Sequence, residues 1–401
     1  MSQEKCVNSK VVKECQICGN TYLKSVLFLG YLPAVNKMVK TGEKPTEQTR
    51  YPAQLLHCPV CDLVQLGLVV DKEILFPPEY PYTSSTTKIL RDNFKELYRC
   101  LCDHLYIDPN DLVVDIGSND GNLLSNFKGH CRVLGITPEE IGKTAPVPTI
   151  IDYFTPEVVS KVLVEHGEAK YITATNVFAH IDNIHEVVNC MLSLLSPNGA
   201  IIIENHYFPS LVKTLQYDTI YHEHLRYYSL KSLKYLFDMH DLEIFFAKPI
   251  PTHGGSIRVY VARKGLNPPY EIKEEPIDLV EFKKDVTLSK LDLMSLLYDL
   301  KIQNKRIYGI SAPSRGSTLI NYTGIDEGIL DYVVEIKGSY KIGNYMPGTL
   351  IPIVDEQRLY EEQPEYTLIL SWHIAEEIIA NLKSRGYQGR FIVPLPTPRI
   401  I

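Results

Sequence analysis

Four cysteines near the amino terminus form two pairs whose spacing is typical of a metal site. Cys15 and Cys18 make one C-x-x-C pair, and Cys58 and Cys61 make the other. The short turn within each pair can direct both thiolates at one ion, so we expect all four to bind a structural zinc ion. Two redox-active C-x-x-C motifs are the alternative, but those need a thioredoxin-like βαβ context, which these pairs lack.

A glycine-containing loop directly follows the apolar run 112–114. It reads D-I-G-S-N-D-G from Asp115 to Gly121. The run predicts a buried strand, and glycines after it let the backbone approach a ligand, with free N–H groups ahead of the next helix. The spacing lacks the middle glycine of the dinucleotide motif, which favours S-adenosylmethionine over NAD. An ordinary strand-to-helix turn is the alternative.

Two further segments combine histidine with carboxylate, amide and hydroxyl groups. Residues 176–180 end in His180, and residues 221–228 contain Tyr221, Glu223 and His224. A histidine can accept a proton near neutral pH, a carboxylate can orient its ring, and a tyrosine can donate to an oxyanion. A polar surface loop with incidental histidines is the alternative, but a cluster beside a ligand crevice favours chemistry.

Apolar strands that alternate with helices would position these groups. Strands are predicted at 112–116, 132–136, 149–152, 171–177 and 200–204, which indicates a doubly wound α/β sheet. Ligands of such sheets lie beyond the carboxyl ends of the strands. The predicted cofactor contacts are therefore Asp115, Gly117, Asn119, Gly121, Thr137, Asp152, Asn176 and Val177. Residues 243–249 and 255–263 predict an antiparallel hairpin that closes the sheet.

A second α/β unit is predicted towards the carboxyl terminus. Residues 265–276 are rich in proline and glutamate and predict a linker, and 278–302 has the apolar spacing of a long amphipathic helix. Strands are then expected at 306–311, 332–335, 367–371 and 390–393. The loop 312–317 opens a helix and carries Arg315, which suits a diphosphate, although a purely architectural role is the alternative. Arg258 and His253 are comparable candidates that we expect to face the interdomain cleft.

Size and composition limit the class of protein. A chain of 401 residues predicts two or three domains, and a formal net charge of −7 argues against a nucleic-acid partner. No stretch approaches the roughly 18 apolar residues of a membrane span, and the polar amino terminus carries no signal peptide. We therefore expect a cytoplasmic protein whose cysteines are reduced or metal-bound.

The whole chain resembles the sugar-nucleotide C-methyltransferases, which are S-adenosylmethionine enzymes of deoxysugar biosynthesis. The resemblance rests on the paired cysteines, the loop 115–121, and the segments 176–182, 221–229, 253–258 and 309–316. It implies a zinc module over 1–75, a Rossmann-like methyltransferase domain over 76–265 and a second Rossmann-like domain over 276–401. The implied reaction is methyl transfer to a ring carbon, usually carbon 3, of a nucleotide-linked 4-keto sugar.

The resemblance also implies roles for individual residues. His224 would be the base that removes a ring proton, and Tyr221 or His180 would hold the enolate oxygen. Glu223 would be a further neighbour, together with Tyr80 or Tyr82 from the proline-rich loop. The substrate contacts would include Tyr80, His253, Ser256, Arg258 and Arg315. We expect a monomer.

The sequence departs from the family pattern at two places. Thr137 stands where most members carry an acid that binds the ribose hydroxyls, so either Glu139 or Glu140 substitutes or the adenosyl group binds weakly or differently. Residues 335–340 replace a stretch that usually resembles Asp-Arg-Asn-Pro. Two other functions stay open: an NAD-dependent nucleotide-sugar oxidoreductase or epimerase, disfavoured by the missing G-x-G-x-x-G, and a non-catalytic sensor of nucleotide sugars.

Overall fold

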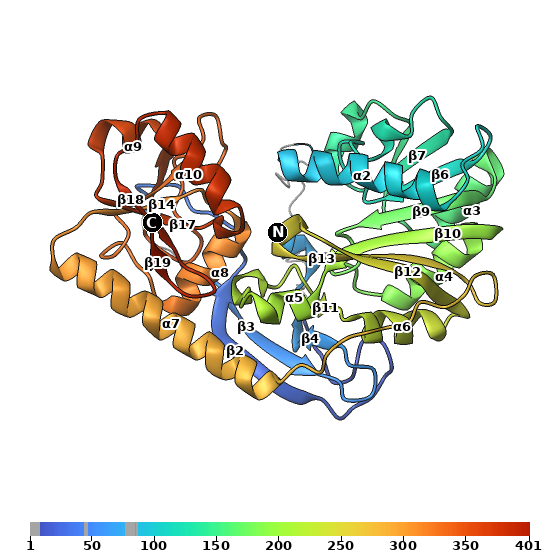
Figure 1. Cartoon of the computed structure of the whole chain (residues 1–401), viewed down its shortest axis with the longest axis horizontal. Helices are drawn as coiled ribbons and strands as arrows, with labels where there is room; N and C mark the ends of the chain where they lie inside the picture. The colour runs from blue at the N-terminus through green and yellow to red at the C-terminus, as the bar shows by residue number, and fades with distance from the viewer. Residues whose placement is uncertain (1–8, 44–46, 77–84, 86) are drawn as a thin grey trace, which may run out of the picture.

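The computed structural model describes residues 9–43, 47–76, 85 and 87–401, in three units built around three main sheets (Figure 1). Tyr80 and Tyr82, two predicted site residues, lie outside the described residues. The predicted class is confirmed: an amino-terminal module with a four-cysteine cluster precedes two α/β units. Among the described residues, no helix combines the length and apolar character that crossing a membrane requires.

The amino-terminal module is an antiparallel sheet whose edge strand, β11, comes from the middle of the chain. Its strand order is β11-β4-β3-β2, with the bounds β2 (Lys24–Pro33), β3 (Arg50–His57), β4 (Val64–Leu66) and β11 (Arg226–Tyr227). A small second sheet and one short helix complete it: β1 (Lys10–Val11), β5 (Leu68–Val69) and α1 (Lys72–Leu75). The module is therefore completed only when residues far along the chain join it.

The central unit is a seven-stranded sheet of order β12-β13-β10-β9-β6-β7-β8. Strands β6 to β10 run parallel, and the hairpin β12–β13 is antiparallel, as predicted. The bounds are β6 (Leu112–Ile116), β7 (Arg132–Thr137), β8 (Thr149–Ile151), β9 (Ala169–Thr175), β10 (Leu195–His206), β12 (Leu242–Ile250) and β13 (Ser256–Arg263). Strand β9 ends two residues before the predicted end because Asn176 adopts a positive φ of 58°.

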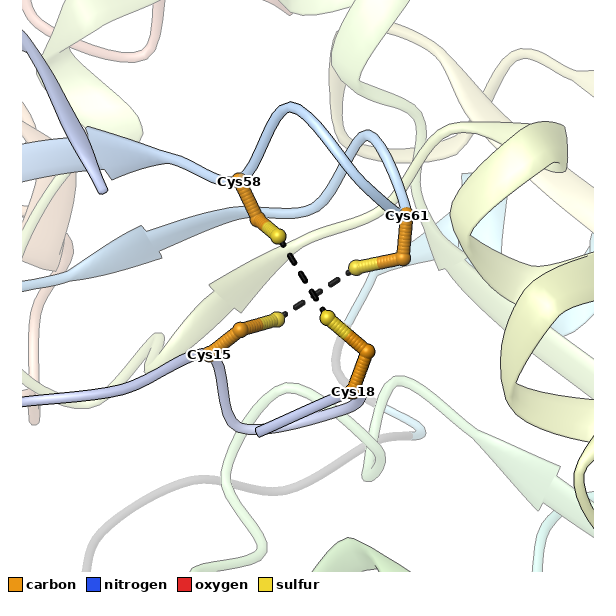
Figure 2. A group of neighbouring side chains, drawn as sticks. All are labelled: Cys15, Cys18, Cys58 and Cys61. Carbon is orange, nitrogen blue, oxygen red and sulfur yellow. Dashed lines mark hydrogen bonds between the residues drawn. The ribbon is translucent and has the colours of Figure 1, made fainter. Parts of the chain in front are cut away.

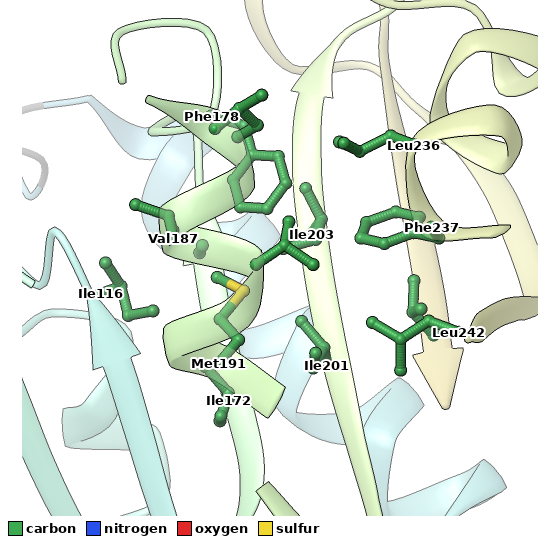
Figure 3. Packing of buried hydrophobic residues seen from close by; sticks show 14 of the residues in the cluster. Ile116, Ile172, Phe178, Val187, Met191, Ile201, Ile203, Leu236, Phe237 and Leu242 are labelled. Atoms are coloured by element: carbon green, nitrogen blue, oxygen red, sulfur yellow. The ribbon is translucent and has the colours of Figure 1, made fainter. Parts of the chain in front are cut away.

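Helices cover both faces of this sheet, with bounds α2 (Lys88–His104), α3 (Pro156–His166), α4 (Ile184–Leu194), α5 (Phe208–Lys213) and α6 (Leu230–Asp238). Figure 3 shows Met191 of α4 and Phe237 of α6 packed around Ile201 and Ile203 of β10. The loop after β6 leads to a three-residue 3₁₀ helix, not the expected longer helix. The Asn126 side chain competes there for backbone oxygens of residues 122 and 123, which disfavours a regular helix.

The carboxyl-terminal unit is a six-stranded sheet of order β16-β15-β14-β17-β18-β19. The four predicted strands are present, and two short edge strands were not predicted: β14 (Ile307–Ile310), β15 (Tyr332–Glu335), β17 (Tyr366–Ile369), β18 (Arg390–Val393), β16 (Ile353–Asp355) and β19 (Arg399–Ile400). The helices are α7 (Leu279–Ile302), α8 (Ser314–Thr323), α9 (Gln357–Glu362) and α10 (Ala375–Ser384).

Helix α7 joins this unit to the rest of the molecule, and Figure 1 shows it along the outer edge from the carboxyl-terminal unit to the amino-terminal module. The Asp278 side chain caps its start by accepting from the backbone N–H groups of Val280 and Glu281. Its inner face shares one apolar core with β2, α5 and α8, through residues that include Leu27, Phe208, Phe282, Leu297 and Leu319. The three units are therefore packed as one body.

Candidate functional site

The four predicted metal ligands converge on one point (Figure 2). All four Sγ atoms lie within 4.8 Å of one another, with Cys15 to Cys61 at 3.3 Å and Cys18 to Cys58 at 3.4 Å. Bonds of about 2.3 Å to a tetrahedral zinc ion would place its ligands about 3.8 Å apart. The thiols are nearly at that spacing, so the cluster fits zinc with all four positions filled by protein.

Each knuckle is closed by a left-handed residue. Gly19 has a φ of 70° and Asp62 a φ of 63°, and each donates its backbone N–H to the carbonyl of the first cysteine, Cys15 or Cys58, at 2.9 Å. This turn brings the paired thiols to one side of the backbone. The Cys61 thiol donates to Cys15 and lowers the pKa of Cys15 to about 5, which favours the thiolate that a metal requires.

The predicted cofactor loop leaves no room for side chains at its first glycine. Gly117 has a φ of 72°, and a Cβ there would lie 2.5 Å from Cγ2 of Val177. Asp115 beneath it is 2% exposed and accepts from the Thr173 hydroxyl at 2.6 Å. Burial, with a smaller contribution from Glu204, raises the pKa of Asp115 to about 7 against the opposing hydrogen bond from Thr173.

The Glu139 carboxylate lies beside Thr137. Glu139 was one of the two acids considered as substitutes for the acid that most family members carry at the position of Thr137. Glu139 accepts from the Asn119 amide and, at 3.4 Å, from the Thr137 hydroxyl. Burial raises the pKa of Glu139. Asp152 is exposed, and its carboxylate accepts from the adjacent Tyr153 N–H at 2.8 Å. Glu139 is therefore better placed than Asp152 to bind hydroxyl groups at this end of the sheet.

Several buried polar atoms at the carboxyl ends of the strands lack partners within the described residues. They include the Ser118 hydroxyl, the side-chain oxygen Oδ1 of Asn176 and both side-chain amide atoms of Asn205. Buried polar groups are nearly always satisfied by protein, water or ligand, so these atoms mark a surface built for a polar ligand. Together with the constricted Gly117 backbone, they fit an adenosyl cofactor lying across β6, β9 and β10.

His224 is held as a neutral imidazole with a defined tautomer. Its Nδ1 lies 2.9 Å from the Thr219 carbonyl oxygen, which can only accept, so Nδ1 carries the proton and Nε2 is unprotonated. The ring is 8% exposed, and burial together with neighbouring His180 lowers the pKa of His224 to about 3. Tyr221 stacks against it with ring centres 4.3 Å apart, and His180 lies 5.1 Å away.

The group that orients His224 is the Thr219 carbonyl, and not a carboxylate as predicted. Glu223 instead accepts from the Asn36 amide of the amino-terminal module at 2.7 Å. Asn36 in turn contacts Ser314 at the start of α8 at 3.3 Å. His180 donates from Nδ1 to the Glu223 backbone carbonyl at 2.7 Å. One residue, Asn36, thus links all three units at the site, and nothing in the local sequence marked it.

The predicted substrate contacts of Arg258 and Ser256 are not supported. Arg258 is fully buried inside the central unit and pairs with Glu204 and Glu96, both at 2.6 Å, so the prediction that it faces the interdomain cleft is wrong. Ser256 is also fully buried, and its hydroxyl donates to the Thr252 carbonyl at 3.0 Å. Both residues belong to β13, which is covered on either side by β12 and β10.

Arg315 and His253 do lie between the two α/β units. Arg315 makes two hydrogen bonds to Asp218, at 2.8 and 2.9 Å, and stacks over Trp372 at 4.9 Å. Its charge is balanced by that carboxylate, so the predicted diphosphate contact would have to compete with Asp218. His253 stacks on His206, with ring centres 5.1 Å apart. His206 ends strand β10, and the strand-end rule that singled out Asn176 could have found it.

The comparisons with known proteins agree with this arrangement. Family models match in order a zinc binding domain over 15–76, a methyltransferase domain over 88–245 and a C-methyltransferase C-terminal domain over 251–396. The C-methyltransferase NovU of Streptomyces niveus is 30% identical over 411 residues, covering 97% of each chain.

Solved structures match part of the chain weakly. A SAM-dependent methyltransferase from Anabaena variabilis is 15% identical, covering 42% of this chain and 84% of that one, with a TM-score of 0.34. Magnesium protoporphyrin IX methyltransferase from Synechocystis is 12% identical, covering 43% and 79%, also with a TM-score of 0.34.

Replacing two zinc ligands should remove the metal. We expect Cys15→Ser with Cys18→Ser to reduce bound zinc from about one ion per chain to a small fraction, because two thiolates do not hold the ion alone. Elemental analysis by mass spectrometry measures this. Cys102→Ser is the matched control, since Cys102 is exposed and outside the cluster; an unchanged zinc content in the double variant would contradict the assignment.

His222 should make stability depend on pH. It lies within the segment 221–228 and is 1% exposed, and burial lowers its pKa to about 4. In the unfolded chain His222 binds a proton below about pH 6.5, whereas in the folded chain it stays neutral down to about pH 4. Its contribution to the free energy of unfolding is therefore fully present above pH 6.5 and is lost as the pH falls towards 4. The loss is about 2 kcal/mol at pH 5. Chemical denaturation at pH 7 and 5 should show a smaller loss in His222→Gln; equal losses would remove His222 as the cause.

Proposed function

Because this chain belongs to the C-methyltransferases, the family of its Streptomyces niveus relative, we propose that it methylates a ring carbon, usually carbon 3, of a nucleotide-linked 4-keto deoxysugar. The donor in this proposal is S-adenosylmethionine. The observation that carries it is the unprotonated Nε2 of His224, held beside Tyr221 at the same edge of the sheet as the cofactor loop. A proton-accepting nitrogen at that place suits removal of an acidic C–H.

The residues at the strand ends would hold the cofactor. The backbone around Gly117 allows close approach, Asn176 offers an unpartnered oxygen, and Glu139 with Asn119 and Thr137 would accept the ribose hydroxyls. When bound, the cofactor supplies an electrophilic methyl group on a sulfonium. A carboxylate two residues beyond the strand end thereby fills the role that the family gives to an acid at the position of Thr137.

His224 would remove the proton next to the ketone, and Tyr221 would stabilise the oxygen of the enolate. The pKa of Tyr221 is raised well above its ordinary value, first by burial and then by Glu223, so its hydroxyl keeps the proton that it must donate. His180 already uses Nδ1–H on the Glu223 carbonyl, which leaves its other nitrogen an acceptor in the neutral ring. Tyr221 is therefore the better oxyanion donor.

The low pKa of His224 has two consequences for catalysis. The base is unprotonated at every pH near neutrality, so it is ready before substrate binds. It is also a weak base in the empty site, since burial disfavours the imidazolium. An enolate forming against the ring would add a negative charge that favours the imidazolium, so the base strengthens as the reaction proceeds. Water exclusion around the ring enhances this effect.

The rival NAD-dependent function has no support in the site, and membership of the C-methyltransferases disfavours it. The sensor hypothesis predicts binding of sugar nucleotides without methyl transfer. Incubation of dTDP-, GDP- and CDP-linked 4-keto sugars with S-adenosylmethionine, followed by mass spectrometry, tests the proposal directly. A mass gain of one methyl group supports it, whereas binding without any gain would favour the sensor.

Removing the base should abolish turnover and spare cofactor binding. We expect His224→Gln to lower kcat about 10²- to 10⁴-fold, because general-base catalysis contributes that much. Its affinity for S-adenosylhomocysteine should stay within about 1 kcal/mol of the parent, since the base acts only in the transition state. Steady-state kinetics and calorimetry measure the two. Unchanged turnover would remove His224 from its role.

Neutralising Glu139 should weaken cofactor binding. We expect Glu139→Gln to reduce the affinity for S-adenosylhomocysteine about tenfold, because a hydrogen bond to a charged group contributes about 1.5 kcal/mol or more. Glu140→Gln is the matched control, since Glu140 is exposed and pairs with Lys143. Calorimetry on both variants would refute the assignment if they bound equally well.

A further inference from the structure

Methyl transfer from a sulfonium to carbon releases one proton for each turnover. In the proposed reaction this proton passes from the sugar carbon to Nε2 of His224. The other nitrogen of His224 already donates to the Thr219 carbonyl, and the ring is 8% exposed. The base must therefore pass its proton on from Nε2 before it can act again, and bulk water does not surround it.

His206 occupies the place where such a proton could go. Its ring centre lies 5.1 Å from that of His224 on one side and 5.1 Å from that of His253 on the other. No hydrogen bond joins these rings directly among the described residues, and at these separations one water can bridge the nitrogens of neighbouring rings. The Nε2 atom of His253 is buried and has no hydrogen-bond partner among the described residues, so it is free to take part.

His206 and His253 are more exposed than His224. His224 is buried, whereas His206 and His253 are partly exposed. His253 sits in η5 (Thr252–Gly254) with a φ of 55°, a backbone conformation that a non-glycine residue rarely adopts. A Cβ at either of the two following glycines would clash with Gln216 or Ser210, and the Gln216 amide holds this turn by donating to the Gly254 carbonyl at 2.6 Å. The strained turn keeps the His253 ring against His206.

The charges around His206 disfavour storage of the proton on the row. Burial lowers the pKa of His206 well below its usual value, and His224, His253, Arg315 and His180 lower it further. The pKa of His253 is lowered to about 4 by burial and by Arg315. Each ring is therefore neutral at rest, with one nitrogen that can accept and one that can donate. A proton that enters the row is therefore not retained on His206 or His253.

A metal site is the obvious alternative for clustered histidines. Over residues 9–43, 47–76, 85 and 87–401, the four cysteines are the one set of three or more ligands whose donor atoms lie within 4.8 Å of one another. The histidines form a row in which each ring contacts the next, and not a ring of ligands around a point. Their arrangement suits transfer along the row.

We propose that His206 relays the proton from His224 to His253 and so to solvent, regenerating the base after each turnover. The proton leaves Nε2 of His224 and binds one nitrogen of His206, whose other nitrogen releases a proton to His253. His253 releases a proton to water in the same way, so each ring returns to its neutral form. This assignment of His206 rests on the proposed function.

Chemical rescue distinguishes a relay from a structural role. We expect His206→Ala to lower kcat about tenfold or more with little change in the KM of the sugar nucleotide, and added imidazole to restore kcat in a concentration-dependent way. His206→Phe keeps a ring in the stack but cannot be rescued, because no space remains for imidazole. His166→Ala, a surface variant, controls for general effects of imidazole. Thermal melting confirms that the variants fold.

A second measurement follows the proton itself. With S-adenosylhomocysteine bound and the sugar nucleotide in deuterated water, the parent should exchange the ring proton, and both His206 variants should exchange it more slowly. Parent-like kcat and exchange in these variants would overturn the relay, as would a raised KM without rescue. A parent that neither methylates nor exchanges would instead overturn the proposed function, so the two failures are distinguishable.

Discussion

The pairing of β4 with β11 is the contact on which the site depends. Leu66 of the amino-terminal module donates its N–H to the carbonyl of Leu225 at 2.9 Å, directly after His224. Strand β4 begins just beyond Cys61, so the metal cluster fixes the hairpin whose outer edge receives β11. A zinc ion with four protein ligands has no reactive position. Its contribution is to give the segment that contains His224 a rigid edge to pair with.

Buried charges join the units where apolar packing alone would leave them free to shift. Asp218, four residues before His222, accepts from both Arg315 and the indole N–H of Trp372 in the carboxyl-terminal unit. Such pairs add little net stability, but their geometry is demanding, and breaking one leaves an unpaired buried charge. This demand holds the segment that contains His224 against the neighbouring unit. The positive charge of Arg315 also lowers the pKa values of the nearby histidines.

Much of the site could be predicted because its groups follow local rules. Asp115, Gly117 and Asn176 lie at strand ends, and the strands themselves could be predicted from their apolar runs. The tautomer of His224 could not be predicted from the sequence. The acceptor that sets it is a backbone carbonyl, and any residue could supply one. Asn36 was missed for a related reason: it contacts Glu223, 187 positions away along the chain. Arg258 was misplaced because the sequence alone does not distinguish an arginine that neutralises buried carboxylates from one that binds phosphate.

The sequence by itself determined the elements: the two cysteine knuckles, the parallel strands, the glycine loop and the histidines that follow strand ends. These depend on spacing, periodicity and backbone freedom, which are properties of neighbouring residues. Only the tertiary structure decided which charges are available to a ligand, which nitrogen of each histidine carries a proton, and that His224, His206 and His253 form a row. Burial and hydrogen-bond partners set these properties, and both arise when distant segments meet.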